Sequence, residues 1–109
     1  MHVIEVRHAE LMESLTEEVQ RLGVTHGAIA SLIGAVDRFT ISTMREHDAL
    51  DDVITEYTMP AEMTGTGEIV DGTVHVHAVM AVEGDRAIGG HLHAATVGTF
   101  FARAYVIPA

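Results

Sequence analysis

Only one segment of this 109-residue chain has the spacing of an amphipathic helix, and this feature limits the fold more than any other. Apolar residues recur every three or four positions between Ala9 and Leu22, and acidic residues and a glutamine fill the other side. The apolar positions are Leu11, Leu15, Val19 and Leu22. The pattern predicts a helix over Glu10–Leu22 that ends at Gly23 and packs on a sheet through its apolar side.

Short β-branched segments make up the rest of the chain. Met1–Arg7 has the residue types of a first strand. After Gly23, strands are predicted near Thr25–Ile33, Phe39–Glu46, Val53–Met59, Thr64–Val70, Val74–Val82 and Thr96–Ile107, punctuated by Gly34, Pro60, Gly72 and Gly84. One main helix packed on a largely antiparallel sheet of about six or seven strands is an α+β fold.

The length allows one hydrophobic core and is too short for two ordinary domains, so we expect residues 1–109 to form a single domain. Apolar residues are 48% of the chain, and a small body has a large surface for its volume, so we also expect self-association. No apolar run approaches the roughly 20 residues that cross a bilayer, and the N-terminus lacks a basic region followed by an apolar segment. These features predict a soluble, cytoplasmic protein without a membrane partner.

The charged residues argue against non-specific attachment to nucleic acid. The chain has 6 basic residues, all of them scattered arginines, against 16 acidic ones, for a formal net charge of −10 with histidine neutral. Attachment to nucleic acid depends largely on cationic side chains that displace counterions from phosphates. DNA is therefore a doubtful partner.

The stretch His47–Asp52 is the most polar connection between predicted strands. A calcium-binding loop would need more oxygen ligands at ordered spacing and a glycine at its bend. We therefore predict a solvated surface loop here.

The chain has no cysteine and 8 histidines, so a soft-metal site must be built from histidine and carboxylate. Strict alternation in Val74–Val79 places His75 and His77 on the same face of a strand, with Cα atoms about 6.6 Å apart. That separation suits two imidazoles that bind one ion. No such partner is found by spacing for the histidines at positions 2, 8, 26 and 47.

A third histidine depends on the register of the hairpin that follows. If Glu83–Asp85 form a three-residue loop to a returning strand, opposed residues have numbers that sum to 168. His77 then faces His91, and His75 faces His93, so that four histidines share one face. A loop of two or four residues would move His91 to the other face.

Gly89 and Gly90 precede the third histidine. A β-bulge at this pair would also reset the register, since adjacent glycines are where such bulges occur. Their missing side chains either let a ligand or a partner backbone approach the site or mark a slack strand end.

Three histidines are a ligand set that zinc uses when one position stays open. Zinc binds imidazole nitrogen at about 2.0 to 2.1 Å in a tetrahedral arrangement, and three protein ligands leave a fourth position for water or an anion. The predicted ligands are His75, His77 and His91. His93 is either a fourth ligand or a neighbouring group.

The run His75-Val76-His77, a turn, and Ile88-Gly89-Gly90-His91-Leu92 resembles the signature of the PPC domain family ("plants and prokaryotes conserved"). The resemblance also covers the helix at Glu10–Leu22 and, in the family's order, the segments Ala30–Val36 and Thr66–Ile69. It is closest to the members that occur alone in bacteria and archaea. The resemblance implies an α+β fold, a homotrimer and a metal, usually zinc, held by histidines that match His75, His77 and His91.

Prokaryotic members of the PPC family are often called DNA-binding proteins by analogy with plant members, which carry AT-hooks. This chain lacks the Arg-Gly-Arg-Pro core of an AT-hook, so DNA binding would have to come from its acidic domain. His93, Ala94 and Ala95 stand where the family often has other residues, a difference that concerns the local shape of the site.

Three functional hypotheses remain. The first is a trimeric zinc-binding PPC protein that recognises a small ligand or has a regulatory role through the open metal position, with Glu68 beside it. The second is DNA binding, as the family is commonly described. The third is a zinc metalloenzyme of unknown reaction, with Glu68 as its base. Because no motif fixes a reaction class, we favour a role other than catalysis.

Overall fold

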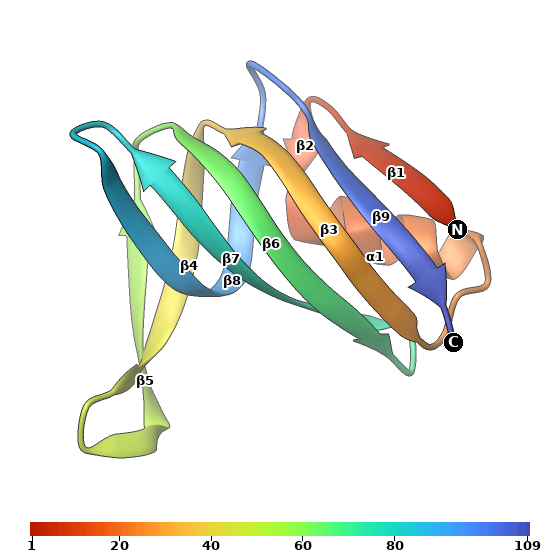
Figure 1. Ribbon diagram of the computed structural model, residues 1–109, viewed down its shortest axis with the longest axis horizontal. Helices are drawn as coiled ribbons and strands as arrows, with labels where there is room; N and C mark the ends of the chain where they lie inside the picture. The colour runs from red at the N-terminus through yellow and green to blue at the C-terminus, as the bar shows by residue number, and fades with distance from the viewer.

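Antiparallel strand pairing organises nearly the whole chain (Figure 1). The computed structural model describes residues 1–109. Its elements are β1 (His2–Val6), β2 (Ala9–Glu10), α1 (Leu11–Arg21), β3 (Gly27–Val36), β4 (Arg38–Arg45), β5 (Asp48–Tyr57), β6 (Ala61–Val70), β7 (Thr73–Val82), β8 (Arg86–Val97) and β9 (Ala102–Pro108). The strands lie in the order β1-β9-β3-β6-β7-β8-β4-β5, and β2 pairs with β8. The predicted α+β class is confirmed, although the sheet has 9 strands rather than six or seven.

The helix forms where the apolar spacing predicts it. Leu11, Leu15 and Val19 are buried, and α1 lies against β1, β7 and β8 on one face of the sheet (Figure 1). The chain leaves the helix through Gly23, whose φ of 72° is a left-handed conformation that glycine adopts without steric cost. No helix has the length and apolar content that a membrane span needs.

Glu10 ties the start of α1 to the sheet. Its carboxylate accepts hydrogen bonds from the backbone N–H groups of Met12 and Glu13, at 3.0 and 2.8 Å. The same carboxylate accepts a third bond, at 2.9 Å, from the backbone N–H of Ala95 in β8. One side chain therefore caps the first turn of the helix and holds it against the strand that carries His91.

The hydrophobic core lies against one face of β7 and leaves the other face more exposed. One continuous cluster of 24 buried hydrophobic residues includes the apolar side of α1 and residues from strands across the sheet. Along β7, Val76, Ala78, Met80 and Val82 are buried and alternate with more exposed positions. The side chains between these core residues, among them His77, therefore leave β7 on the opposite face.

The predicted strand Thr96–Ile107 is wrong, because the chain divides it between two separate strands. β8 continues to Val97, and β9 begins only at Ala102. β8 pairs with β4 and β7, whereas β9 pairs with β1 and β3. The residues between them carry the chain from one part of the sheet to another, so they leave the strand ladder.

The prediction that a strand ends before Gly34 is also wrong, since β3 continues to Val36. At Gly34 the backbone of β9 passes so close that an added Cβ would collide with the carbonyl oxygen of Phe101. This glycine therefore permits close strand packing and does not end the strand.

The predicted surface loop His47–Asp52 is wrong as well, because Asp48–Asp52 belong to β5. β4 and β5 form a hairpin that projects from the body of the molecule (Figure 1), here called the β4–β5 arm. Every residue of β5 except Tyr57 is exposed. Pairing with β4, rather than burial, orders this segment, so its polar residues show no strand alternation.

We predict that Glu10→Ala lowers the free energy of unfolding by about 2 kcal/mol, because three backbone N–H groups lose their acceptor. Denaturant unfolding followed by circular dichroism, at one protein concentration, measures the change. Glu17→Ala is the matched control, since Glu17 is exposed on the same helix, and it should change the value by less than about 0.5 kcal/mol. Equal stability of the two variants would contradict the capping role of Glu10.

Candidate metal centre

His75 and His77 lie on β7 and leave it on the face opposite the core. They flank Val76, whose side chain is fully buried, so burial of the valine fixes the direction of both imidazoles. His75 is partly buried and His77 is exposed. The predicted common face of the two residues is confirmed.

The three-residue loop between β7 and β8 forms as predicted and brings His91 to the same face. β7 ends at Val82, which pairs with Arg86, and the ladder runs back to the pair His77 and His91. These residue numbers have the predicted sum, with no bulge at the glycines between them. The further pairing of His75 with His93 is wrong, because the ladder between β7 and β8 ends at His77 and His91. On the other side of β7, His75 lies opposite Glu68 of β6.

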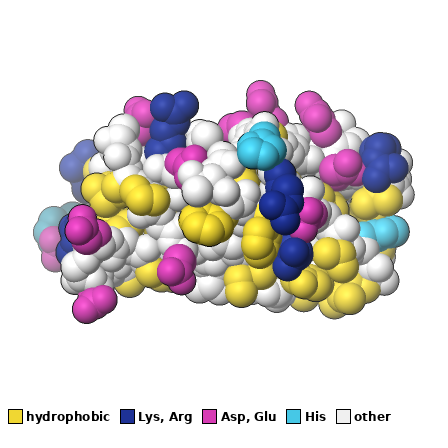
Figure 2. Space-filling model, turned by 90° about the horizontal axis from the view of Figure 1, so that it is seen from above, with side chains coloured by type: hydrophobic (Ala, Val, Ile, Leu, Met, Phe, Trp, Pro, Cys, Tyr) yellow, Lys and Arg dark blue, Asp and Glu magenta, His cyan; other side chains and the backbone are white.

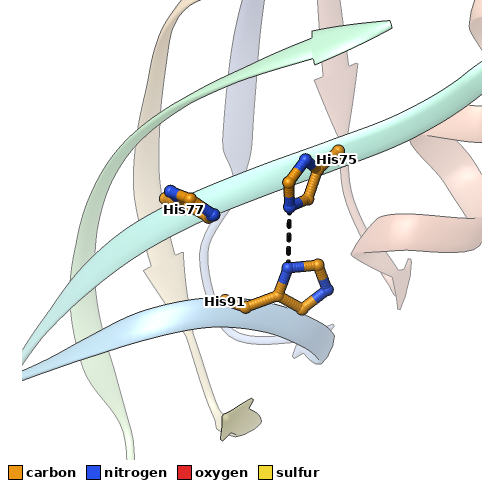
Figure 3. A group of neighbouring side chains, drawn as sticks. All are labelled: His75, His77 and His91. Carbon is orange, nitrogen blue, oxygen red and sulfur yellow. Dashed lines mark hydrogen bonds between the residues drawn. The ribbon is translucent and has the colours of Figure 1, made fainter. Parts of the chain in front are cut away.

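The three imidazoles lie close together on the β7–β8 hairpin, two from β7 and one from β8 (Figure 3). Nε2 of His75 lies 2.9 Å from Nδ1 of His91, and one nitrogen from each of His75, His77 and His91 lies within 4.8 Å of the others. Nitrogens on a tetrahedral zinc ion are separated by roughly 3.3 Å, given its usual bond lengths. The 2.9 Å distance and the 4.8 Å limit bracket that value, so the three nitrogens are close enough together to hold one zinc ion.

The surroundings of His91 favour the neutral form that a metal ligand needs. Burial lowers the pKa of His91 below its ordinary value, and repulsion from His93, His75 and His77 lowers it further. The carboxylate of Asp52, on the β4–β5 arm, acts in the opposite direction. The net direction is downward, so the His91 imidazole keeps a free nitrogen lone pair at neutral pH.

His93 lies beside the three-histidine group without belonging to it. Its ring centroid is 4.5 Å from that of His91, but its Nε2 is hydrogen-bonded at 2.7 Å to Oγ of Ser42. The register of β8 against β4 shifts here, since Thr40 pairs with Ala94 whereas the next residue of β4 pairs with Leu92. The bulge therefore occurs at His93, against β4, and not at Gly89 and Gly90, where the sequence leaves a bulge open as an alternative.

Glu68 also lies next to the group, on β6. Its Oε1 is 3.9 Å from Nδ1 of His75, and its side chain is exposed. The structure thus places Glu68 beside the site, as predicted, through the pairing of Glu68 with His75 across β6 and β7.

The two glycines before His91 differ in what surrounds them. A Cβ on Gly90 would collide with the carbonyl oxygen of Ser42 and lie 2.9 Å from a methyl group of Ile41. A Cβ on Gly89 would make only ordinary contacts, at 3.5 Å. The missing side chain of Gly90 therefore allows β4 to approach. The backbone that comes close to this glycine belongs to a strand of the same chain.

A groove of about 750 Å³ opens beside the candidate centre. Its lining includes His77, His91 and His93 at the centre, Ser42 on β4, and Asp52 on the arm. Ser42 and Asp52 were not predicted to take part. No spacing pattern could have found them, because both come to the site only through the pairing of β4 with β8 and β5.

The remaining histidines lie outside the group. His26 is paired with Asp71, with Nε2 and Oδ1 3.3 Å apart, at an exposed position.

The sequence model of the Plants and Prokaryotes Conserved (PCC) domain family matches residues 1–108. The chain belongs to this family. The PCC domain is the family whose signature the histidine hairpin resembles, and the match extends over nearly the whole chain. No curated protein matches the chain.

Several solved structures share the fold of this PCC domain. A metal-containing protein from Archaeoglobus fulgidus is 24% identical with a TM-score of 0.77, and the match covers 98% of this chain and 77% of that one. A protein from Ralstonia eutropha JMP134, named provisionally as DNA-binding, is 20% identical with a TM-score of 0.79 and coverages of 98% and 76%. A PPC protein from Pyrococcus horikoshii is 17% identical with a TM-score of 0.76 and coverages of 99% and 79%. At these identities the similarity shows the fold.

We predict that Gly90→Ala lowers the free energy of unfolding by about 3 kcal/mol, since the added methyl group needs space that the β4 backbone occupies. Gly89→Ala is the matched control and should cost less than about 1 kcal/mol, because its methyl group meets only ordinary contacts. Denaturant unfolding of both variants measures the difference. If Gly90→Ala is as stable as Gly89→Ala, β4 does not pack as closely on Gly90 as described.

Proposed function

We propose that this protein is a zinc-binding PCC domain that assembles as a homotrimer and binds a small ligand at the open position of the metal. The observation that carries the proposal is the convergence of His75, His77 and His91, with one nitrogen of each within 4.8 Å of the others. Three imidazoles without cysteine or carboxylate suit zinc among the common divalent ions. The metal-containing relative from Archaeoglobus fulgidus, which has the same fold, is consistent with this role.

The open position supports a binding role. Three protein ligands leave one place on a tetrahedral ion, and His77 and His91 line the groove of about 750 Å³. A small molecule in this groove would reach the ion directly. The metal would then supply the binding energy for an electron-pair donor, and the groove would select its size.

Exposed apolar side chains support self-association. On the β4–β5 arm, Met44, Leu50 and Ile54 are 67%, 96% and 62% exposed, and Val3 and Ile33 of the sheet are more than half exposed. Hydrophobic side chains reach the surface in several places in Figure 2. Burial of such residues against other copies would stabilise an oligomer, and the number three follows from the resemblance to the PPC family.

DNA binding is less well supported by the charges of this chain. The net charge is −10 with histidine neutral, and four of the six arginines form ion pairs with carboxylates. In Figure 2 the arginines lie among acidic side chains. A phosphate backbone would therefore meet little free positive charge.

A catalytic role needs a second reacting group in addition to a metal. Glu68 is the nearest candidate base, 3.9 Å from His75, and no further arrangement around it defines a reaction. We therefore propose binding and not catalysis as the function of the site.

We predict that the protein purified without chelator contains about one zinc ion per chain. His91→Ala should lose the zinc, because only the imidazoles of His75 and His77 then remain to hold it. Elemental analysis measures the metal, and light scattering measures the trimer. His26→Ala, which removes a histidine outside the group, is the control and should keep the zinc. Loss of zinc with a retained trimer indicates a functional site, and joint loss indicates a structural one. A wild-type protein without metal would contradict the proposal.

We predict that zinc is released on acidification towards about pH 5, because protons compete with the ion for three imidazoles. Because the pKa of His91 is lowered, its imidazole stays neutral to a lower pH than that of an ordinary histidine. This shift moves the release of zinc to lower pH. Dialysis at stepwise lower pH followed by elemental analysis gives the release curve. Stoichiometric metal well below pH 5 would count against an all-histidine ligand set.

A further inference from the structure

Ser42 is the one polar residue among the buried residues of this protein, with 4% of its surface exposed. It lies on β4 directly opposite His91 of β8. Its Oγ is hydrogen-bonded at 2.7 Å to Nε2 of His93, a residue 51 positions away in the sequence. A buried hydroxyl needs a hydrogen-bond partner. Here the partner is His93, which lies two residues beyond His91 on β8.

His93 is the same kind of donor as the three converging histidines. It leaves β8 two residues after His91, and the two ring centroids are 4.5 Å apart. Because His93 occupies the bulge, it has no opposite residue in β4 that would restrict its side chain. A zinc ion with a fourth imidazole is fully coordinated and has no place for an external ligand. Something must therefore keep His93 away from the ion if the site is to stay open.

We propose that Ser42 is a positioning residue that holds His93 apart from His75, His77 and His91, and thereby keeps the fourth metal position open to a small anion from the groove. The proposal rests on the proposed function, since it assumes zinc at the three histidines. It adds a means of regulation. When the hydrogen bond between Ser42 and His93 is intact the site binds an external anion, and when the bond is lost His93 takes that place.

The size of the effect follows from the hydrogen bond. A single hydrogen bond between a hydroxyl and an imidazole shifts an equilibrium between two side-chain positions by up to about tenfold. Ser42, His91 and His93 all line the groove, so an anion in the groove and the imidazole of His93 would compete for the same position. Loss of the bond should therefore weaken anion binding by up to about tenfold.

The test uses azide as the anion and the cobalt-substituted protein as the reporter, because the visible absorption of cobalt changes with its ligands. Azide is titrated into the wild type, Ser42→Ala, His93→Ala and the double variant Ser42→Ala/His93→Ala. Thr40→Ala, a change of another hydroxyl residue on β4 outside the groove, is the control. We expect azide to bind about tenfold more weakly to Ser42→Ala, whose spectrum changes before azide is added. Thr40→Ala should bind azide as the wild type does. Once His93 is replaced, loss of Ser42 should make no further difference, so the double variant should match His93→Ala.

The double variant decides whether the effect passes through His93. If it binds azide as weakly as Ser42→Ala alone, or if Ser42→Ala binds azide as tightly as the wild type, the inference is overturned. Imidazole nitrogen chemical shifts of the zinc-loaded wild type give a second test that needs no substitution. They should show three ligating histidines and a free His93, and a ligating His93 would overturn the inference.

Uptake of cobalt and zinc by the wild type is measured first. A protein that binds neither ion overturns the proposed function together with this inference. A protein that binds one ion per chain, but whose Ser42→Ala variant has unchanged azide affinity, overturns only the role of Ser42.

Discussion

The candidate centre depends on the alternation of buried and polar side chains along β7 and β8. Val76 on β7 and Leu92 on β8 are almost completely buried, and their burial directs the neighbouring histidines to the opposite face. The three-residue loop between the strands then sets a register in which His77 faces His91. A change of one residue in that loop would turn His91 into the core, because side chains alternate between faces with a period of two. The position of the site is thus set by the hydrophobic core behind it.

The close packing of β4 against β8 places Ser42 beside His91 and His93. Gly90 lacks a side chain where the Ser42 carbonyl passes, so β4 and β8 pack closely just before the third histidine. The ladder between them then shifts at His93, and the shift lets His93 reach the Ser42 hydroxyl. Gly90 and the bulge at His93 lie in the same short segment of β8 but have different consequences. The glycine brings the strand near, and the bulge decides which side chain contacts it.

The sequence predicts those parts of the structure that rest on local patterns. The spacing of Leu11, Leu15 and Val19 indicates the helix, and the alternation around His75 indicates the common face of His75 and His77. The face of His91 depends on a loop length that the sequence alone leaves open. The segment Asp48–Asp52, at the start of β5, escapes prediction because it is fully exposed and has no buried face to give it an alternating pattern. Ser42 escapes for a related reason: its contact with His93 joins residues 51 positions apart. Such contacts follow from sheet order, which no local pattern encodes.

The charge of the ligand set bears on what the proposed centre would bind. Three neutral imidazoles leave both positive charges of a zinc ion uncompensated, whereas carboxylate ligands would neutralise them. The neighbouring carboxylate nearest to a ligand, on Glu68, is 3.9 Å from His75 and exposed, so water screens much of its effect. Asp52 lines the groove and would offset part of the charge of the ion, but two positive charges would still leave a small positive region there. The acidic surface of the protein would disfavour large polyanions such as DNA, while a small anion that fits the groove would meet the ion itself. Under the proposed function, this combination favours a small anionic ligand.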